Sequence, residues 1–324
     1  MPADVIPTIA PRREGLPFLW SVMIPCYNAP ESFLAETLRS VLAQDAGRDL
    51  MQIAVVDDAS PHGPPTELVR QLAGDRITVY CSQKNLGLAG IWNRCLELAQ
   101  GRWVHILHQD DLVHPGFYRK MLEGAQSLDA PGMLYCRHAF IDAQGKQLWH
   151  SDLDASLAGR LPDPLPLLAH KQMIQTPAVV VRREVYETLG GFRPDLCYSL
   201  DWEMWCRIAR YFPVWFEPEV LASYRLHGNA TTSRLRVNGA DIVDLKKCIR
   251  INTDYIADDR QRAAVRRCAE ERYALMATSY AEDLLGAGNR AAALRQLRGA
   301  WQCYPSLAVL KKIIRLSPAL LLTV

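Results

Sequence analysis

An acidic pair follows a short apolar run in the segment WVHILHQDDL, where Asp110 and Asp111 come shortly after His108. Carboxylate oxygens are the ligands that hard divalent cations such as Mg2+ and Mn2+ prefer, and such cations also share the phosphate oxygens of a ligand. A neutral imidazole can complete the ligand set. An Asp pair after a strand is also ordinary turn chemistry. Taken alone, the segment predicts either a cation site or a turn.

Two further polar clusters come directly after apolar runs of strand length. Tyr27 and Asn28 follow LWSVMIPC, and Asp57 and Asp58 follow QIAVV. If these runs are parallel strands of one sheet, their carboxyl ends share one edge, which is where such sheets bind ligands. Three polar strand ends on one edge favour a binding site over three unrelated turns.

The elements that position these clusters alternate between strands and helices. Apolar runs at residues 19–25, 52–56, 77–81 and 103–107 have strand length, and stretches with helical spacing of apolar residues separate them. This alternation indicates right-handed βαβ crossovers. The predicted fold class is α/β, with a mostly parallel, Rossmann-like sheet flanked by helices.

The pattern changes in the second half of the chain. Residues 133–150 predict a hairpin, and residues 200–212 predict a helix with Asp201 in its first turn. Beyond residue 232 the chain is predicted to be helical to its end, with one helical hairpin that turns at GAGN. Residues 1–18 carry four prolines and predict a loose lead-in.

Composition and charge exclude several classes of protein. A net charge of +2 gives no broad basic field for binding nucleic acid. Nine scattered cysteines without a repeated spacing favour neither a disulfide framework nor a zinc site, so a cytoplasmic protein is expected. The N-terminus lacks the apolar core of a signal peptide, and no run reaches the roughly 18 apolar residues of a membrane span.

Five segments occur in the order that is seen in family 2 glycosyltransferases. They are MIPCYNAPESFLAETLRSVLAQ, IAVVDDASPHG, NLGLAGIWNRCLELAQGRWVHILHQDDLVHPGFY, GGFRPDLCYSLDWEMWCRIAR and YRLHGN. Over residues 19–230 the chain resembles this inverting family of the GT-A fold. The resemblance implies transfer of a sugar from a nucleotide-diphosphate sugar to an acceptor hydroxyl. It also implies a divalent cation, Mn2+ or Mg2+.

The resemblance divides the chain into regions with different roles. It implies a GT-A domain at 19–232, with a nucleotide-binding half at 19–130 and an acceptor half at 131–232, followed by a helical region at 233–324. Two aspartates, Asp57 and Asp58, are candidates for one contact to the base or ribose. The implied nucleotide-sugar residues are Pro25, Tyr27, Asn28, Asp57, Asp58, Asn85, Gly87, Asn93, His108 and Gln109.

The sequence departs from the family pattern at two of these places. His108 stands where the first acidic residue of a D-x-D-D segment is usual, and Trp92 replaces the Arg of an Arg-Asn pair. Asp110 is the implied cation ligand. His108 is expected to bind the cation, to contact the ribose, or simply to pack. His227 is expected near the cation or the diphosphate, with a loop histidine as the alternative.

The resemblance implies that Asp201 is the catalytic base, since an acceptor hydroxyl is a poor nucleophile until a carboxylate takes its proton. Glu203 is the fallback candidate. A carboxylate in the first turn of a helix is also stabilised by the helix dipole, which accounts for many such residues without any catalytic role.

The expected acceptor is a saccharide or a lipid-linked saccharide, in the synthesis of a cell-surface polysaccharide or glycolipid. The segment LAVLKKIIRLSPALLL at residues 307–322 predicts either a packed helix or peripheral contact with the inner face of the cell membrane. A nucleotidyltransferase is disfavoured, because no glycine-rich basic loop opens the chain. A catalytically impaired sugar-nucleotide-binding or scaffold protein remains the alternative.

Overall fold

The computed structural model describes residues 5–12, 15–127, 130–228 and 231–321. It divides the chain into two compact units. The first unit comprises Met1–Pro162, Met173–Asp195 and Tyr211–Leu226, and the second comprises Asp163–Gln172, Leu196–Arg210 and His227–Val324. Each unit is therefore assembled from segments that are distant in sequence.

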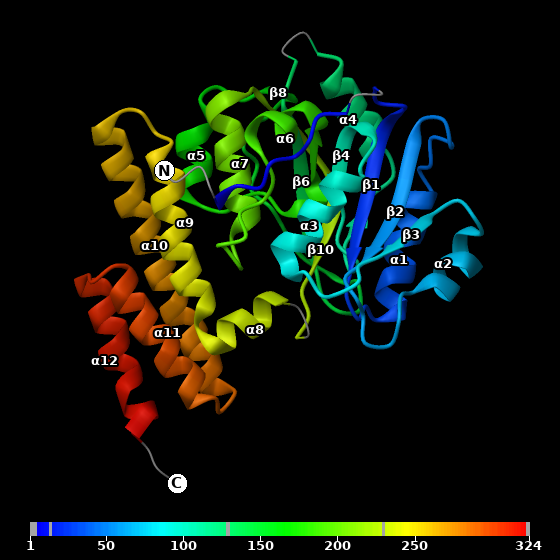
Figure 1. Cartoon of the computed structure of the whole chain (residues 1–324). Helices are drawn as coiled ribbons and strands as arrows, with labels where there is room; N and C mark the ends of the chain where they lie inside the picture. Colours follow the sequence, from blue (N-terminus) through cyan, green and yellow to red (C-terminus); the bar gives the residue numbers. More distant parts are fainter. Residues whose placement is uncertain (1–4, 13–14, 128–129, 229–230, 322–324) are drawn as a thin grey trace. The chain divides into compact units, whose positions relative to one another are not determined.

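The first unit contains one ten-stranded mixed sheet (Figure 1). Its strands are β1 (Phe18–Cys26), β2 (Met51–Asp57), β3 (Thr78–Cys81), β4 (Gly101–Ile106), β5 (Leu112–Val113), β6 (Met133–Ile141), β7 (Gln147–His150), β8 (Gly159–Arg160), β9 (Val179–Arg182) and β10 (Val214–Arg225). The order is β3-β2-β1-β4-β9-β6-β10-β5, with β7 paired to β6 and β8 paired to β10.

Strands β1 to β4 are parallel neighbours, as the alternating pattern predicts. Beyond β4 the sheet is mixed, because β9 pairs antiparallel with both β4 and β6 while β10 runs parallel to β6. The antiparallel pair of β6 and β7 is the predicted hairpin. The predicted α/β class is confirmed.

Helices cover both faces of this sheet. The helices of the first unit are α1 (Glu31–Leu42), α2 (Thr66–Ala73), α3 (Gly87–Leu98), α4 (Phe117–Ala125) and α6 (Arg183–Leu189), with a short 3-10 helix at Thr176–Ala178. Because side chains alternate along a strand, Trp20, Val22 and Ile24 of β1 share one core cluster with residues of α1 and α4. Helix α3 packs on β1, β2 and β4, and its buried side chains lie outside that cluster.

The second unit is helical. It contains α5 (Pro164–His170), most of α7 (Leu200–Tyr211), α8 (Thr231–Asn238), α9 (Ala240–Asp254), α10 (Asp259–Gly286), α11 (Arg290–Cys303) and α12 (Leu307–Leu321). Helices α10 and α11 form the predicted hairpin around GAGN, and α9, α11 and α12 all pack against α10 (Figure 1). Asp258 and Asn289 cap α10 and α11 by accepting backbone N–H hydrogen bonds.

The register shift in strand β10 and the burial of part of the N-terminal lead-in were not predicted from the sequence. Strand β10 carries Pro218, and its pairing with β6 shifts register on either side of Val220, which is the irregularity expected where a proline cannot donate to a ladder. The expected lead-in at 1–18 lies partly outside the described residues. Within its described part, Ile9 is 1% exposed, and Pro7 O accepts a hydrogen bond from Gly191 N at 2.8 Å.

Among the described residues, no helix combines the length and apolar character that a membrane crossing requires.

Candidate functional site

The polar clusters that follow β1, β2 and β4 lie at one edge of the sheet. Cys26 pairs with Asp57, and Met23 pairs with Ile106, so the carboxyl ends of the three strands are aligned. Asp58 N donates to Cys26 O at 2.8 Å and continues the ladder past the end of β2. The predicted convergence of these loops is present in the structure.

His108, Asp110 and Asp111 form a group that can hold a metal ion. One ligand atom from each of them lies within 4.8 Å of the others. Asp111 is fully buried, whereas His108 and Asp110 are partly exposed. Two carboxylates and an imidazole are a donor set suited to a divalent first-row transition ion, and they leave room for phosphate oxygens.

The backbone of β10 holds Asp111 in place. Arg225 N donates to Asp111 Oδ1 at 2.9 Å, and Thr37 Oγ1 donates to Asp111 O at 2.8 Å. The other carboxylate oxygen, Oδ2, lies 3.3 Å from His108 Nδ1, and no donor among the described residues meets hydrogen-bond geometry there. Burial raises the pKa of Asp111 to about 6, although His108 opposes that shift. A buried carboxylate oxygen without a good donor fits a nearby cation.

Arg225 is a residue that sequence reasoning missed. Its side chain is fully buried; Nε donates to Asp110 O at 2.8 Å, and Nη2 donates to Glu36 Oε2 at 2.6 Å. Its guanidinium also lies over the Phe33 ring, 4.6 Å from the ring centroid. Arg225 therefore fixes the backbone of the acidic loop. The sequence signal for Arg225 is its place at the end of a run of strand length. It stands in the same segment, YRLHGN, as the candidate His227.

The loops after β1 and β4 are joined by Gln109. Gln109 Oε1 accepts a hydrogen bond from Tyr27 N at 2.8 Å, and Nε2 donates to Tyr27 O at 3.4 Å. Asn28 adopts a left-handed conformation with φ of 47°, and its N–H donates to Ser60 Oγ. These contacts fix the backbone of Tyr27, a residue that is 40% exposed, at the strand-end edge.

Asp57 and Asp58 are both buried, and both hold loop backbone: Asp57 in its own loop, and Asp58 in the loop that precedes α3. Asp57 accepts hydrogen bonds from Ser60 Oγ at 2.5 Å and from Ser60 N at 3.0 Å. Asp58 accepts from Leu86 N at 2.7 Å and from Gly87 N at 3.1 Å, just where α3 begins. Burial raises the pKa of Asp58. Asn85 Nδ2 donates to Asp58 O at 3.1 Å, so the predicted N-x-G segment adjoins the second strand end.

Asn93 and Pro25 are buried and have packing roles in this structure. Asn93 Nδ2 donates to Phe192 O at 2.9 Å, and Asn93 Oδ1 accepts from Phe192 N at 2.7 Å. The side-chain amide of Asn93 therefore binds the Phe192 backbone, in the loop that follows α6, and does not face the strand-end edge. Pro25 pairs with Val56 inside the sheet. His105 is also in the core, and burial lowers its pKa to about 3.

Asp201 and His227 belong to the second unit. Asp201 lies in the first turn of α7 and is partly exposed. Its Oδ2 accepts a hydrogen bond from Gln172 Nε2 at 2.6 Å, and its Oδ1 accepts from Trp202 N at 2.7 Å. Gln172 is itself held by Tyr273 of α10, whose hydroxyl accepts from Gln172 N at 2.7 Å. The His227 backbone carbonyl accepts from Ser233 Oγ at 3.1 Å.

Glu203, the fallback base, is fully buried in the second unit. Its Oε1 accepts a hydrogen bond from the Tyr255 hydroxyl at 2.6 Å, and its Oε2 lies 3.1 Å from Arg207 Nη2. A carboxylate that is enclosed and paired in this way cannot reach an acceptor hydroxyl without unfolding its surroundings. The geometry therefore leaves Asp201 as the better candidate base of the two.

A family model described as glycosyl transferase family 2 matches residues 21–190. An uncharacterized glycosyltransferase of Rickettsia typhi is 28% identical over 218 residues, which are 66% of this chain and 66% of that protein. The succinoglycan biosynthesis protein ExoO of Rhizobium meliloti is 30% identical over 139 residues, or 43% of this chain and 34% of ExoO. The matched region spans 66% of a Rickettsia prowazekii relative and only 35% of a Rickettsia conorii relative.

Solved structures share the fold. TarS residues 1–349 from S. aureus superpose with a TM-score of 0.61 at 15% identity, covering 93% of this chain and 85% of that one. The mannosyltransferase PcManGT from Pyrobaculum calidifontis, solved with GDP-Man and Mn2+, gives a TM-score of 0.54 at 19% identity and covers 100% of this chain and 85% of its own. At these identities the likeness establishes the GT-A-like fold alone.

Proposed function

The chain belongs to glycosyl transferase family 2, and we propose that it is an inverting, cation-dependent glycosyltransferase that uses a nucleotide-diphosphate sugar. The observation that carries this proposal is the group of His108, Asp110 and Asp111 at the carboxyl end of β4. It lies at the edge of the sheet where parallel α/β folds bind nucleotides.

We propose that the neighbouring loops hold the nucleoside and the diphosphate. The exposed Tyr27 ring and the backbone of Asn28 border this edge, and Gln109 fixes the loop that carries them. Asp57 and Asp58 shape the same loops, and either has further lone pairs for a base or ribose contact. PcManGT was solved with GDP-Man and TarS with UDP-GlcNAc, which supports a nucleotide-sugar donor without choosing the base.

Asp110 is the proposed cation ligand at this edge, with His108 and Asp111 beside it. A bound divalent cation would offset the charge that develops on the diphosphate as it leaves. His227 belongs to the second unit, and we propose that it contacts the cation or the diphosphate when the donor is bound.

We propose that Asp201 acts as the general base. Its carboxylate takes the proton of the acceptor hydroxyl while the acceptor oxygen forms a bond to the anomeric carbon. The bond from that carbon to the diphosphate breaks, and the nucleoside diphosphate leaves with the electron pair. Attack from the opposite face inverts the anomeric configuration. The hydrogen bond from Gln172 supports the role by holding the carboxylate in one orientation.

We propose a saccharide or lipid-linked saccharide as acceptor, for a cell-surface polysaccharide or glycolipid. The likeness to the succinoglycan biosynthesis protein ExoO supports this class. Asp201 lies in residues 196–210, which belong with residues 163–172 and the C-terminal helices to one compact unit. We therefore propose that the second unit helps to bind the acceptor.

The test is release of nucleoside diphosphate from a panel of UDP, GDP and dTDP sugars with Mn2+, Mg2+ or EDTA. Cation-dependent turnover of one donor is expected, and NMR of a transferred product gives its anomeric configuration. Cation-dependent donor binding without hydrolysis, and without transfer to an extract of lipid-linked saccharides, would instead support the sugar-nucleotide-binding or scaffold alternative.

We also propose peripheral contact between the second unit and the inner face of the cell membrane. Residues 287–324 carry six Lys and Arg and no Asp or Glu. Exposed apolar side chains on α11 and α12 accompany these cations, with Trp301 42%, Leu307 67% and Ile314 61% exposed. Apolar side chains among cations suit an anionic lipid surface.

Sedimentation with vesicles tests this contact. Binding to phosphatidylcholine vesicles that contain phosphatidylglycerol, but not to phosphatidylcholine alone, is expected, and Ile314→Glu should weaken it. Val243, which is 63% exposed on α9, gives the control Val243→Glu, which should leave binding unchanged. Equal sedimentation of the wild type and Ile314→Glu would refute the proposed face.

A further inference from the structure

The carboxylate of Asp244 on α9 binds the loop immediately before α7. Its Oδ1 accepts a hydrogen bond from Cys197 N at 2.7 Å. Its Oδ2 accepts from Tyr198 N at 3.1 Å, from Ser199 N at 2.9 Å and from the Ser199 hydroxyl at 2.6 Å. Asp244 is 6% exposed, and hydrogen bonds to an ionised acceptor are about twice as strong as neutral ones. One side chain of the C-terminal helices therefore fixes three consecutive loop residues.

Helix α9 also holds Ser199 at its carbonyl. Cys248, one turn along α9 from Asp244, donates its S–H to Ser199 O at 3.5 Å. The same carbonyl accepts from Glu203 N at 3.1 Å, which is a first-turn hydrogen bond of α7. Because residues four apart lie on one face of a helix, Asp244 and Cys248 together hold the residue from which α7 starts.

The proposed base follows Ser199 by two residues. At an ordinary helix start, the hydroxyl of the residue before the helix accepts a hydrogen bond from an N–H of the first turn. Here the Ser199 hydroxyl is turned toward Asp244, and Trp202 N donates to Asp201 Oδ1 at 2.7 Å. Asp244 thereby leaves the first-turn N–H of Trp202 to the carboxylate of Asp201.

We infer that Asp244 is a positioning residue that sets the place and direction of the Asp201 carboxylate. The inference rests on the proposed function, in which Asp201 takes the proton of the acceptor. A displacement of about 1 Å at a reacting group can cost about 100-fold in rate, so the anchor of the loop before α7 should affect catalysis. The helical region beyond residue 232 then contributes to the reaction itself, because α9 supplies that anchor.

A double-mutant cycle with the full chain tests this role. Asp244→Asn keeps the shape of the side chain but replaces one acceptor oxygen by an amide that donates. With the donor that the panel identifies and an extract of lipid-linked saccharides, Asp244→Asn should lower kcat about tenfold or more and leave the KM for the donor within about twofold. In the Asp201→Asn background the same substitution should change the residual rate by less than about twofold, because the base that it positions is absent.

A matched control lies on the same helix. Asp241 is 1% exposed and accepts a hydrogen bond from Gln296 Nε2 of α11 at 2.7 Å. Asp241→Asn should lower the free energy of unfolding without changing the kcat of the folded protein. Circular dichroism at the assay temperature gives the folded fraction, by which each rate is divided.

A second variant covers the case in which Asp244→Asn does not fold. Ser199→Ala removes only the hydroxyl donor and leaves the three backbone hydrogen bonds to Asp244. It should lower kcat about threefold in the chain that has Asp201 and leave the rate of the Asp201→Asn chain unchanged. An unchanged kcat in both chains would overturn the inference.

Failure of the inference and failure of the proposed function give different results. The inference is overturned, and the proposed function stands, if folded Asp244→Asn keeps the wild-type kcat or loses no more than Asp241→Asn. The same holds if Asp244→Asn lowers the rate by equal factors with and without Asp201, which is the result of a merely structural role. Full transfer activity in Asp201→Asn would refute the base and the inference together, and no turnover of any donor by the wild type would refute the proposed function as well.

Discussion

The carboxylates of Asp111 in the first unit and Asp201 in the second are both oriented by hydrogen bonds, but their surroundings differ. Asp111 is fully buried, and backbone and side-chain groups of distant segments fix both its carbonyl and its carboxylate. Asp201 is partly exposed at the start of a helix, and the side chain of Gln172 orients it.

The difference matches the two proposed roles, in which Asp111 helps to build the cation site and Asp201 takes the proton of the acceptor. A carboxylate bound by buried backbone groups keeps a loop in one conformation, so its loss should affect folding and cation binding together. A partly exposed carboxylate at the start of a helix should cost less stability to replace, and in the proposed mechanism it meets the acceptor. Substituting Asp111 should therefore affect stability and cation binding, whereas substituting Asp201 should affect the rate of transfer.

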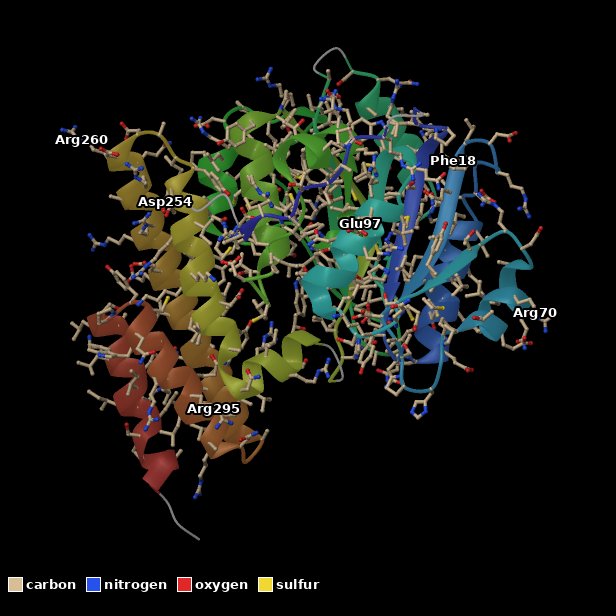
Figure 2. The ribbon with its side chains drawn as sticks, in the orientation of Figure 1. Phe18, Arg70, Glu97, Asp254, Arg260 and Arg295 are labelled. Atoms are coloured by element: carbon tan, nitrogen blue, oxygen red, sulfur yellow. The ribbon has the colours of Figure 1, made fainter. Side chains whose placement is uncertain are left out.

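Asp201→Asn should produce the largest change in rate. Removing a general base lowers turnover about 10³-fold, while stability changes little because the side chain keeps its shape. Initial rates of transfer with and without acceptor measure the effect. The control is Asp254→Asn at the end of α9, where Asp254 pairs with Arg266 at the surface (Figure 2). Turnover within about threefold of the wild type in Asp201→Asn would remove Asp201 as the base.

Arg225→Met should produce the largest loss of stability. The buried guanidinium holds Asp110 O and pairs with Glu36, so its removal should lower the free energy of unfolding by about 3 kcal/mol. Urea unfolding measures the change. The control Arg70→Met removes an exposed pair with Glu67 at the outer side of α2 (Figure 2) and should change stability by at most about 0.5 kcal/mol. Equal effects of the two would contradict the anchoring role.

Gln172→Leu should have a smaller effect, on rate alone. Without its N–H donor the Asp201 carboxylate loses orientation and a stabilising hydrogen bond, so kcat should fall about tenfold. Because an N–H donor favours the ionised carboxylate, the acidic limb of the pH–rate profile should move to higher pH. The exposed Gln261 supplies the control Gln261→Leu. A fall in kcat without a shifted profile would assign Gln172 a structural role only.

The sequence predicted the first four strands and the polar edge because these signals are local. Each strand there is a short apolar run followed by a turn, and parallel order follows from the intervening helices. The hairpin of β6 and β7 and the pair of α10 and α11 were recognisable for the same reason. The family pattern added candidate roles that no periodicity could supply.

Strand β10 and Arg225 could not be predicted because their structure depends on distant partners. Pro218 and Glu217 interrupt the apolar pattern that predicts a strand. Hydrogen bonding to β6 and β5 stabilises the extended backbone that the local strand propensity does not favour. Likewise, nothing near Asn93 in sequence indicates that its amide binds the Phe192 backbone. The contact of His108 with Trp92 also joins residues of a helix and a loop that only the fold brings together.

The most direct test of the account is calorimetric measurement of donor binding with Mn2+ for the wild type, Asp110→Asn and Asp201→Asn. The donor is the sugar nucleotide that the panel shows to be turned over. Asp110→Asn should lose Mn2+-dependent binding about tenfold or more, because a cation ligand is gone, whereas Asp201→Asn should bind the donor as the wild type does and fail only in transfer. Unchanged donor binding in Asp110→Asn, or equal losses of binding in both variants, would contradict the account, in which Asp110 binds the cation and Asp201 acts only as the base.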